Sequence, residues 1–365
     1  MKFSASRETI LKPLHAVIGV VERRQTMPIL SNILLTVNDN KLTMTATDLE
    51  VELRAETEVK VSSPGEITVP GRKLHDIFRA LPDGVQVDFA LSGDRATVKA
   101  DRSRFKLSTL RAADFPMVDE VSAQQTLRLD RQELRHLLEQ TQFSMAQQDV
   151  RYYLNGLLFE VEGKTLRSVA TDGHRLALAE LEMAESAQRN EQIIVPRKGV
   201  LELQRLLDGD GEVELTLATN HVRAQLDSIR FTSKLIDGKF PDYGRVVPAE
   251  PRNIVKADRN LLRHALQRAA ILSNEKYRGV RLALAENNVI IQANNPEQEE
   301  AEESVEVEYS GEEMEIGFNV TYLLDALSAV SEEQVELGLG DTNSSCLIRA
   351  PGSVNSKFVV MPMRL

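Results

Sequence analysis

The segment TDGHR at 171–175 holds the residues best suited to catalysis. Its Asp172 precedes His174 by two positions, and a carboxylate placed there could orient an imidazole as a general base. An earlier segment, TDLE at 47–50, has the same Thr-Asp pair but no histidine. Because the pair recurs without the imidazole, we interpret TDGHR as a turn at the end of a strand, shaped by aspartate and glycine. A three-domain enzyme that uses Asp172 and His174 is the alternative hypothesis.

Other motifs of catalysis, phosphate binding and metal binding are absent from the sequence. It contains no G-x-x-x-x-G-K, no G-x-G-x-x-G after a strand and no G-x-S-x-G segment. The six histidines show no H-x-x-x-H spacing, so we expect no metal site. Cys346 is the only cysteine and cannot form an intrachain disulfide. We therefore predict no catalytic residues, no cofactor and no metal.

Basic residues recur on the polar faces of five segments that have the apolar periodicity of amphipathic helices. These basic residues are Arg7, Lys12, Arg72, Lys73, Arg79, Arg131, Arg135, Arg197, Lys198, Arg205, Arg259, Arg263 and Arg268. A charged helix face is usually only a solvated face, and this interpretation stays open for each helix taken alone. If the helices share one surface, that surface would be positive and could follow a phosphate backbone without reading its sequence.

The charge of the chain is unevenly distributed along its length. The net charge of −11 would by itself argue against nucleic-acid binding. Residues 1–125 are neutral, whereas residues 126–250 carry −4 and residues 251–365 carry −7. Between Glu297 and Glu315 there are ten glutamates and no lysine or arginine. This segment is either a solvated acidic surface or one complementary to basic residues near the N-terminus of another copy.

The sequence repeats itself with a period of about one domain. Pro70 in VPGRKL and Pro196 in VPRKGV lie 126 residues apart. Phe105, Phe231 and Phe358 follow one another at intervals of 126 and 127 residues. The Thr-Asp and Phe-Pro pairs recur at intervals of 124 and 125 residues. Landmarks that recur in order at one spacing indicate three tandem domains.

Each repeat has the same predicted order of elements. Apolar residues at helical spacing predict one helix at the start and another in the middle of each repeat. We expect these helices over 10–17, 74–81, 134–141, 200–207, 262–269 and 320–327. Alternating apolar and polar residues predict antiparallel strands between them. The sequence therefore predicts an α+β fold of three similar domains, 1–122, 123–249 and 250–365, each with helices on one face of its sheet.

Composition favours a cytoplasmic protein. Hydrophobic residues make up 42% of the chain, and no apolar run is long enough to span a bilayer. The N-terminal MKFS lacks the apolar region of a secretory signal. We expect no association with a membrane.

Seven long segments, in unbroken order, resemble the bacterial DNA polymerase III β sliding clamp family, the processivity factors of the replicative polymerase. They are DVRYYLNG (149–156), ATDGHRLA (170–177), VPRKGV (195–200), FTSKLIDGKFPDY (231–243), AILSNEKYRGVRL (270–282), NNPEQEEAEE (294–303) and VVMPMRL (359–365). The resemblance covers the whole chain. It implies a non-catalytic homodimer, closed head to tail into a ring around duplex DNA, with helices lining the hole and sheets outside. A peptide-binding scaffold without a DNA role is the second alternative, but it does not explain the basic helix faces.

The resemblance also implies the partners and their mode of docking. The ring would be opened by a separate, ATP-dependent clamp loader and would slide on DNA without sequence preference. Short apolar-aromatic peptides would dock the loader, the replicative polymerase subunit, translesion and repair polymerases, and mismatch-repair and ligation factors. No reaction would be catalysed by the chain itself.

Three sets of site residues carry over from the family by position. The peptide pocket would use Leu154, Thr171, Gly173, His174, Arg175, Leu176, Pro241, Arg245, Val246, Tyr277, Asn343, Ser345, Val359, Val360, Met361, Pro362, Met363 and Arg364. DNA contacts would come from Arg24, Arg72, Gln148, Tyr152, Tyr153, Arg197, Lys198 and Arg205. The dimer interface would use Lys73, Arg102, Phe105, Leu107, Ile271, Leu272, Glu297, Glu300 and Glu303. In the pocket, we expect residues 361–365 to form one whole wall, because Met adapts to varied apolar partners.

Overall fold

The computed structural model describes residues 1–21, 27–118, 122–249 and 251–364. These residues form two compact units. The first comprises Met1–Gln132 and Lys198–Leu235, and the second comprises Glu133–Arg197 and Ile236–Leu365. The middle repeat of the sequence therefore contributes strands to both units. Every pairing between the named strands of the described residues is antiparallel, as the alternating sequence pattern predicts.

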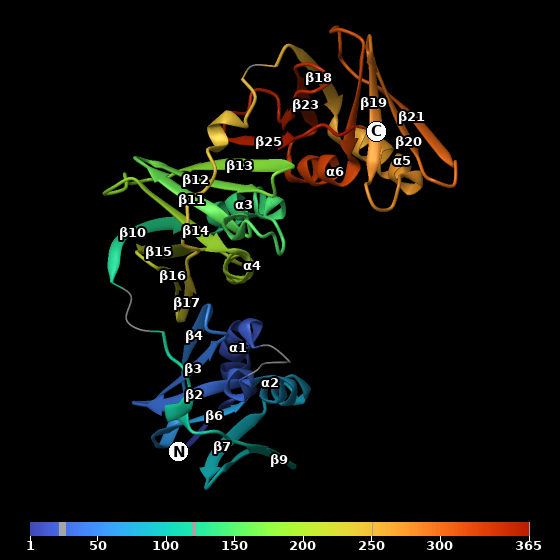
Figure 1. Cartoon of the computed structure of the whole chain (residues 1–365). Coiled ribbons are helices and arrows are strands. Elements are labelled where there is room, and N and C mark those ends of the chain that lie inside the picture. The colour runs from blue at the N-terminus through green and yellow to red at the C-terminus, as the bar shows by residue number, and fades with distance from the viewer. Residues whose placement is uncertain (22–26, 119–121, 250, 365) are drawn as a thin grey trace. The chain divides into compact units, whose positions relative to one another are not determined.

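The first unit contains two sheets (Figure 1). The larger sheet has the order β10 (Ala123–Asp130), β15 (Glu212–Ala218), β16 (His221–Leu226), β17 (Ile229–Lys234), β4 (Val51–Glu58), β3 (Lys41–Thr47), β2 (Asn32–Asn38) and β6 (Gly65–Pro70). The smaller has the order β5 (Lys60–Ser63), β1 (Lys2–Ser6), β7 (Gln86–Ser92), β8 (Arg95–Ala100) and β9 (Ser103–Ser108). Its helices are α1 (Arg7–Val17), α2 (Gly71–Ala80) and α4 (Arg197–Leu206), with 3-10 turns η1 (Ile18–Val20), η2 (Pro28–Ser31) and η3 (Ala112–Asp114).

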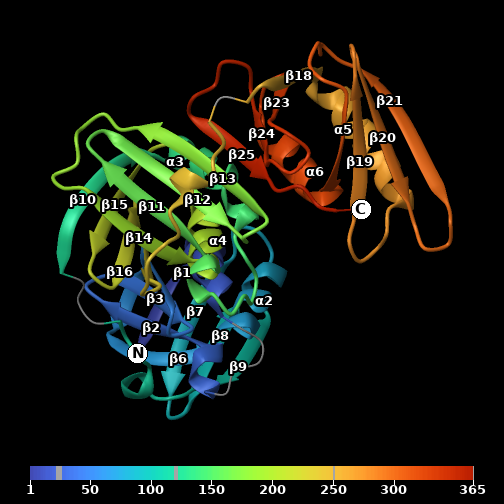
Figure 2. The ribbon, with the colours of Figure 1, turned by 45° about the horizontal axis from the view of Figure 1, so that its top comes forward.

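The second unit repeats this plan (Figure 2). Its larger sheet has the order β14 (Glu191–Pro196), β11 (Gly156–Glu162), β12 (Thr165–Thr171), β13 (Arg175–Glu182), β25 (Ser356–Val360), β24 (Cys346–Arg349), β23 (Gln334–Leu339) and β18 (Asn253–Asp258). Its smaller sheet has the order β21 (Glu300–Glu306), β20 (Asn288–Asn294), β19 (Gly279–Ala285) and β22 (Met314–Asn319). The remaining elements are α3 (Arg131–Glu139), α5 (Arg259–Ala269), α6 (Val320–Ala329), η4 (Gln142–Ser144), η5 (Tyr152–Leu154), η6 (Tyr243–Arg245) and η7 (Ala270–Leu272).

All six predicted helices are present, and side chains at their starts explain where several of them begin. The hydroxyl of Ser6 accepts the Thr9 N–H before α1, and the Asp258 carboxylate accepts the Leu261 N–H before α5. Asn319 caps α6 in the same way. These caps satisfy N–H groups that have no partner inside the helix. The apolar stripes of α1 and α5 then pack on sheets, α1 on β3 and β4 and α5 on β20 and β21.

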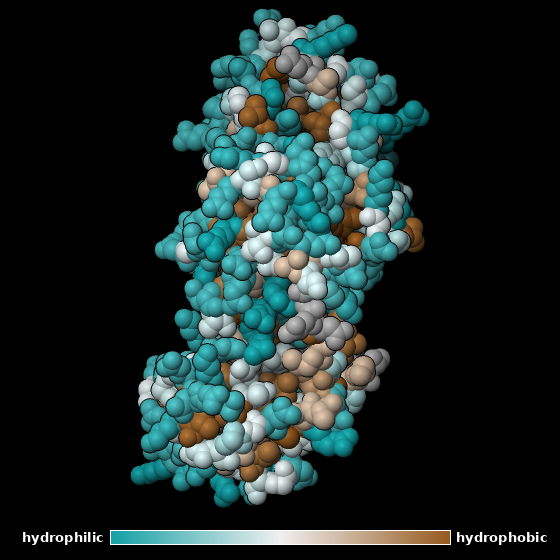
Figure 3. All heavy atoms as spheres, turned by 90° about the vertical axis from the view of Figure 1, so that its left-hand side faces the viewer, coloured by the Kyte–Doolittle hydropathy of each residue, from teal (hydrophilic) through white to brown (hydrophobic). Residues whose placement is uncertain are grey.

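Two strand pairings join neighbouring repeats. In the first unit, β17 of the middle repeat pairs with β4 of the first repeat. In the second unit, β13 of the middle repeat pairs with β25 of the last repeat. Each larger sheet is therefore built from two repeats and continues from one into the other. On the face drawn in Figure 3, hydrophilic residues predominate and hydrophobic residues form small separate groups, as expected for sheets with one wet face.

One basic residue of the predicted helix faces is buried. Arg131, at the start of α3, donates to the carbonyl oxygen of Glu212 at 3.0 Å and forms an ion pair with Asp227 at 2.8 Å. Arg131, Glu212 and Asp227 all belong to the first unit, and these contacts fix the Arg131 side chain there. The expectation of a solvent-facing Arg131 was therefore wrong, because sequence periodicity does not show which long-range partner a side chain finds.

The core beside β25 provides a test of the fold. Phe358 is buried in the apolar cluster that α5, α6 and the last repeat share, and its ring lies 6.1 Å from that of Phe143. We expect Phe358→Ala to lower the free energy of unfolding of this unit by about 3–5 kcal/mol, because it removes a buried aromatic side chain. Hydrogen exchange at β25 amides would measure the change. The neighbouring Lys357→Ala is the control, and equal protection in both variants would contradict the assignment.

Candidate functional site

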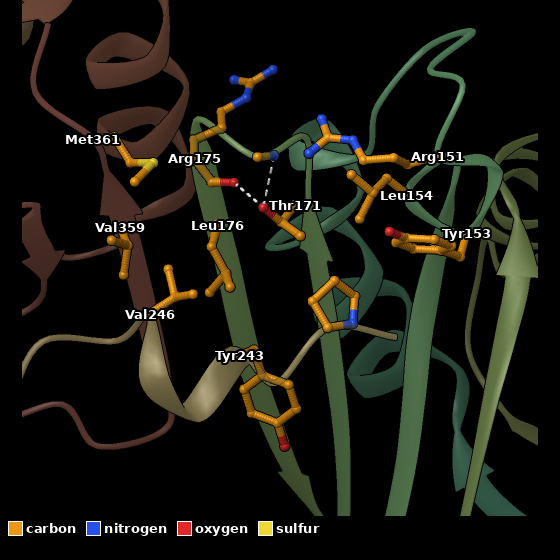
Figure 4. A pocket seen from close by; sticks show the side chains of 12 residues that line it. Arg151, Tyr153, Leu154, Thr171, Arg175, Leu176, Tyr243, Val246, Val359 and Met361 are labelled. Carbon is orange, nitrogen blue, oxygen red and sulfur yellow. Dashed lines mark hydrogen bonds between the residues drawn. The ribbon is translucent and has the colours of Figure 1, made fainter. Parts of the chain in front are cut away.

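An apolar pocket lies where β13 and β25 pair (Figure 4). Its cavity volume is about 180 Å³. The lining residues are Arg151, Tyr153, Leu154, Thr171, Gly173, Arg175, Leu176, Pro241, Tyr243, Val246, Val359 and Met361. In Figure 4, Met361, Val359 and Val246 stand on one side, and Arg151, Leu154 and Tyr153 stand on the other. The pocket therefore presents apolar side chains to a ligand, with a few polar groups at its edge.

The TDGHR segment forms the predicted turn at one edge of this pocket. The Thr171 hydroxyl donates to the carbonyl oxygen of Arg175 at 2.6 Å and accepts the N–H of Gly173 at 3.1 Å. The Asp172 carboxylate accepts the N–H groups of His174 and Arg175 at 2.9 and 3.0 Å. Gly173 has a φ of +88°, a conformation that glycine adopts without strain. The carboxylate of the hypothetical catalytic pair is thus used by the backbone of the turn.

The side chain of Arg175 ties this turn to the last repeat. Its guanidinium forms an ion pair with Asp172 at 3.1 Å and another with Asp325 of α6 at 2.5 Å. It also donates to the Phe143 carbonyl oxygen at 2.9 Å and lies 4.5 Å from the centre of the Tyr322 ring. Because these four groups surround it, the Arg175 guanidinium is fixed between the turn and the last repeat.

A polar network holds Tyr243 at the floor of the pocket. Its hydroxyl donates to Glu160 and accepts a hydrogen bond from Arg167 at 2.9 Å. Arg167 also pairs with Glu180 at 2.6 Å. Burial, followed by the bond to Glu160, raises the pKa of Tyr243 to about 12, so the phenol stays neutral at physiological pH. The ring can therefore offer an apolar face to a ligand while Glu160 and Arg167 hold its hydroxyl in place.

Arg151 forms a charged lip at the opposite edge. It pairs with Asp149 at 2.8 Å and donates to the Asp172 carbonyl oxygen at 3.3 Å. Hydrogen bonds from the side chain and the backbone of Arg151 lower the pKa of Asp149 to about 2. The neighbouring Tyr153 packs edge-on against Tyr152, with ring centres 5.9 Å apart. This lip is accessible and could contact an acidic group of a ligand.

The structure brings together half of the residues that were expected to form the pocket. Leu154, Thr171, Gly173, Arg175, Leu176, Pro241, Val246, Val359 and Met361 line it. Its lining does not include His174, Arg245, Tyr277, Asn343, Ser345, Val360, Pro362, Met363 or Arg364. Sequence reasoning missed Arg151 and Tyr243 and had assigned Tyr153 to DNA. Arg151 and Tyr243 lie within DVRYYLNG and FTSKLIDGKFPDY, two segments that carry the family resemblance, but the prediction gives neither residue a role in the pocket.

Strand alternation explains why Val360 is not in the pocket. Side chains along β25 point to opposite faces in turn. Val359 belongs to the apolar cluster beneath the pocket, whereas Phe358 and Val360 belong to the core cluster of the last repeat. The structure therefore places Val359, and not Val360, in the lining, and the role expected of Val360 stays a prediction.

The tail beyond Met361 turns away from the pocket. The N–H of Met361 donates to the His174 carbonyl oxygen at 2.9 Å, which continues the pairing of β25 with β13. Two residues later, the N–H of Met363 donates to the Gly317 carbonyl oxygen at 2.8 Å. This bond places Met363 at the edge of β22. Met361 alone among the described tail residues lines the pocket. Leu365 lies outside the described residues, and the wall expected from the whole tail stays a prediction.

The residues expected to touch DNA have varied environments. Arg72 donates to the Val21 carbonyl oxygen at 2.6 Å, and Lys198 pairs with Asp48. Arg205 donates to the Ala16 carbonyl oxygen at 2.6 Å, at the end of α1, and pairs with Glu202 at 2.8 Å.

Two further members of this set are exposed, and one is partly buried. Gln148 and Tyr152 are exposed. One terminal nitrogen of Arg197 is buried without a hydrogen-bond partner in the described part of the chain. Burial, and then the charge of Arg175, lower the pKa of Arg197. Arg24 lies outside the described residues.

The residues expected at the dimer interface lie at sheet edges and on an exposed turn. Phe105 and Leu107 belong to β9, the last strand of the five-stranded sheet, and Lys73 and Arg102 are exposed. Glu300 and Glu303 belong to β21, the edge strand of the four-stranded sheet, and Glu297 is exposed just before it. Ile271 on η7 is 76% exposed, beside the partly buried Leu272.

A metal-binding cluster and a membrane-spanning helix are both absent from the described residues. No group of three or more histidine, cysteine, aspartate or glutamate side chains is arranged to hold a metal ion within these residues. Within the same residues, no helix has both the length and the apolar character needed to cross a bilayer.

Comparison with known proteins identifies the family. Residues 1–119, 128–242 and 244–364 match the N-terminal, central and C-terminal domains of the DNA polymerase III beta subunit, respectively. The beta sliding clamps of Pseudomonas aeruginosa and Escherichia coli K12 are 56% and 52% identical to the chain, over all of both sequences.

Solved structures agree with this match. The crystal structure of the Pseudomonas aeruginosa DNA polymerase III subunit beta has a TM-score of 0.97 and 55% identity, with all of both chains covered. A structure of that species' clamp bound to griselimycin has a TM-score of 0.96 and 56% identity over the same extent. The fold is therefore that of three tandem clamp domains built from antiparallel sheets. The chain belongs to the DNA polymerase III beta subunit family, the beta sliding clamps, which are non-catalytic processivity factors.

Proposed function

We propose that the chain works as a ring-shaped homodimer that encircles duplex DNA and tethers the replicative polymerase and other proteins to it. The observation that carries this proposal is the match of all three clamp domains over the whole chain. We place the domain boundaries at 1–122, 123–249 and 250–365. The site of action is the cytoplasm, where a bacterial chromosome is replicated.

The pocket beside β13 and β25 is the proposed docking site for partner peptides. Its apolar lining and charged lip suit a short segment with one or two apolar anchors, which carry most of the energy in small interfaces. The griselimycin-bound structure of a relative supports a ligand-binding role for clamps of this kind. The proposed partners are the clamp loader, the replicative polymerase subunit, translesion and repair polymerases, and mismatch-repair and ligation factors.

The proposed DNA contacts are electrostatic and weak. Arg24, Arg72, Gln148, Tyr152, Tyr153, Arg197, Lys198 and Arg205 are the candidate residues. A phosphate oxygen could satisfy the buried nitrogen of Arg197, which has no partner among the described residues. Because several other candidates already bind carbonyl or carboxylate oxygens, their charge is partly neutralised within the chain.

The proposed dimer joins β9 of one chain to β21 of another. These strands end their sheets, and an unpaired edge is a template for strand addition. The other edge of the four-stranded sheet, β22, is contacted by Met363 of the tail. β9 carries Arg104 and Lys106, whereas β21 carries Glu300 and Glu302, so their charges are complementary. Glu303 is already paired with Arg268 at 2.6 Å within the chain.

The pocket can be tested with two exposed residues. We expect Met361→Ala with Val246→Ala to weaken binding of a fluorescein-labelled Gln-Leu-Ser-Leu-Phe peptide by about tenfold or more, because apolar anchors lose their contacts. Fluorescence anisotropy measures the affinity. Val354→Ala, at another exposed apolar position, is the matched control. Unchanged affinity in the double variant would place the peptide site elsewhere.

DNA contact can be tested through its salt dependence. We expect Arg72→Gln, Arg197→Gln and Lys198→Gln together to speed loss from nicked circular DNA after loading. The slope of log affinity against log salt should fall by about 0.9 for each phosphate contact removed. The control replaces the exposed Lys60, Arg95 and Arg128 on strands. Retention and slope equal to those of the parent would exclude these residues as contacts.

Dimer formation should depend on the apolar turn η7. We expect Ile271→Ala with Leu272→Ala to give a folded monomer at low micromolar concentration, because buried apolar anchors at an interface are worth about 2 kcal/mol or more. Sedimentation velocity reports the mass. Leu261→Ala, an exposed leucine on α5, is the control. A double variant that still sediments as a dimer would refute this assignment.

A further inference from the structure

In the first unit, β4 pairs with β17 (Figure 1). A second pocket lies where this pairing ends. Its cavity volume of about 180 Å³ equals that of the first pocket. Its lining includes Thr47, Leu49, Pro116, Met117, His221 and Lys234. The Thr-Asp and Phe-Pro pairs that recur along the sequence therefore form the edges of both pockets.

The turns at the two pockets have the same hydrogen bonds. The Thr47 hydroxyl donates to the Val51 carbonyl oxygen at 2.9 Å and accepts the Leu49 N–H at 3.0 Å. The Asp48 carboxylate accepts the N–H groups of Glu50 and Val51 at 2.9 and 2.7 Å. Each bond has a counterpart in the TDGHR turn. The backbone frame of the first pocket is thus present a second time.

The strand opposite each turn also corresponds, residue by residue. Lys234 follows the end of the β17 pairing with β4, and its N–H donates to the Glu50 carbonyl oxygen at 2.8 Å. Met361 follows the end of the β25 pairing with β13, and its N–H donates to the His174 carbonyl oxygen at 2.9 Å. Lys234 therefore occupies the place in the second pocket that Met361 occupies in the first.

The second pocket differs from the first in its side chains. Leu49 stands where the first pocket has Gly173, and its φ is +79°, in the left-handed region that a leucine rarely adopts. This backbone leaves the Leu49 side chain 39% exposed at the cavity. Met117 is 52% exposed beside it. The second pocket thus offers an apolar surface together with a cationic side chain.

The charges around this pocket favour an acidic ligand. Lys234 is exposed and makes no ion pair within the part of the chain that the structure describes. Two carboxylates of this region are already engaged, since Asp48 pairs with Lys198 and the buried Glu52 accepts the Val118 N–H at 3.0 Å. A third, Glu50, is exposed beside Lys234, because its carbonyl oxygen accepts the Lys234 N–H. Burial raises the pKa of Glu52. The exposed cationic side chain of Lys234 is therefore available to a carboxylate of a ligand.

We propose that the second pocket binds a short extended peptide that carries an apolar side chain next to a carboxylate. The apolar side chain contacts Leu49, Pro116 and Met117, and the carboxylate pairs with Lys234. The inference rests on the peptide-binding function proposed for the first pocket, because the second pocket has the same backbone arrangement. The two pockets then select different peptides, the first by Met361 and the second by Lys234.

Methionine methyl NMR on the full-length protein can test both pockets at once. Met117 lines the second pocket and Met361 lines the first, so each reports on its own site. Their signals are assigned with Met117→Leu and Met361→Leu. The probes are Ac-Asp-Glu-Leu-Asp-Ser-NH2, its neutral counterpart Ac-Asn-Gln-Leu-Asn-Ser-NH2, and Gln-Leu-Ser-Leu-Phe. We expect the acidic probe to shift the Met117 signal saturably, with at least tenfold weaker binding by the neutral probe.

Charge variants provide the decisive comparison. Lys234→Gln should lower the affinity for the acidic probe, and Lys234→Glu should lower it at least tenfold. Lys60→Glu, at an exposed strand position, should leave this affinity unchanged. An unmoved Met117 signal, or equal binding by Lys234→Glu and the parent, would overturn the proposal. Failure of Gln-Leu-Ser-Leu-Phe to shift the Met361 signal would instead refute the function proposed for the first pocket. If every probe shifted only the Met361 signal, all of them would bind at the first pocket, and the proposal for the second pocket would be overturned.

Discussion

Main-chain pairing between neighbouring repeats is the constraint on which the rest of the structure depends. β4 pairs with β17 and β13 pairs with β25, so each larger sheet continues through a domain boundary. Without these pairings, four-stranded sheets would end in exposed hydrogen-bonding edges. Their register also decides which residues meet, as when Arg175 faces Val360 and Val51 faces Ser233. Both pockets arise where these registers end.

The structural role of each residue explains whether it recurs between the repeats. Thr47 and Thr171 recur because their hydroxyl groups bond to the backbone of the turn. Phe115 and Phe240 recur because each is buried in an apolar cluster, where its volume is required. The side chains of Met361 and Lys234, which line the cavities at matching positions, make no such bonds within the described part of the chain. They can differ without disturbing the frame, and the frame therefore supports more than one binding preference.

The helices and the sheet type could be predicted from the sequence because both are set by local periodicity. An apolar stripe at helical spacing must be buried, and the strands alternate between a wet and a dry face. The same alternation separates the two valines that were expected in the pocket. Since Phe358 is a core residue, Val360 must share its face and only Val359 could reach the pocket.

The missed pocket residues depend on contacts that sequence spacing does not reveal. Tyr243 is positioned by Arg167 and Glu160, which lie 76 and 83 residues away in the chain. Arg131 was expected in solvent, but it finds Asp227 on a distant turn. In both cases a polar side chain is fixed by a partner that lies far away in the sequence. The family resemblance indicates where the peptide pocket lies in the sequence, whereas such long-range contacts determine its detailed shape.

The charge distribution fits a protein that is held on DNA by its topology. A tightly binding protein would need many free cations, yet the chain carries a net charge of −11. Several basic helix residues are already engaged, as Lys198 is with Asp48 and Arg205 is with Glu202. Phosphate contacts by such side chains compete with internal partners and are screened over about 10 Å at 0.1 M salt. Weak contacts of this kind would let a closed ring move along the duplex, because no single contact holds it in place.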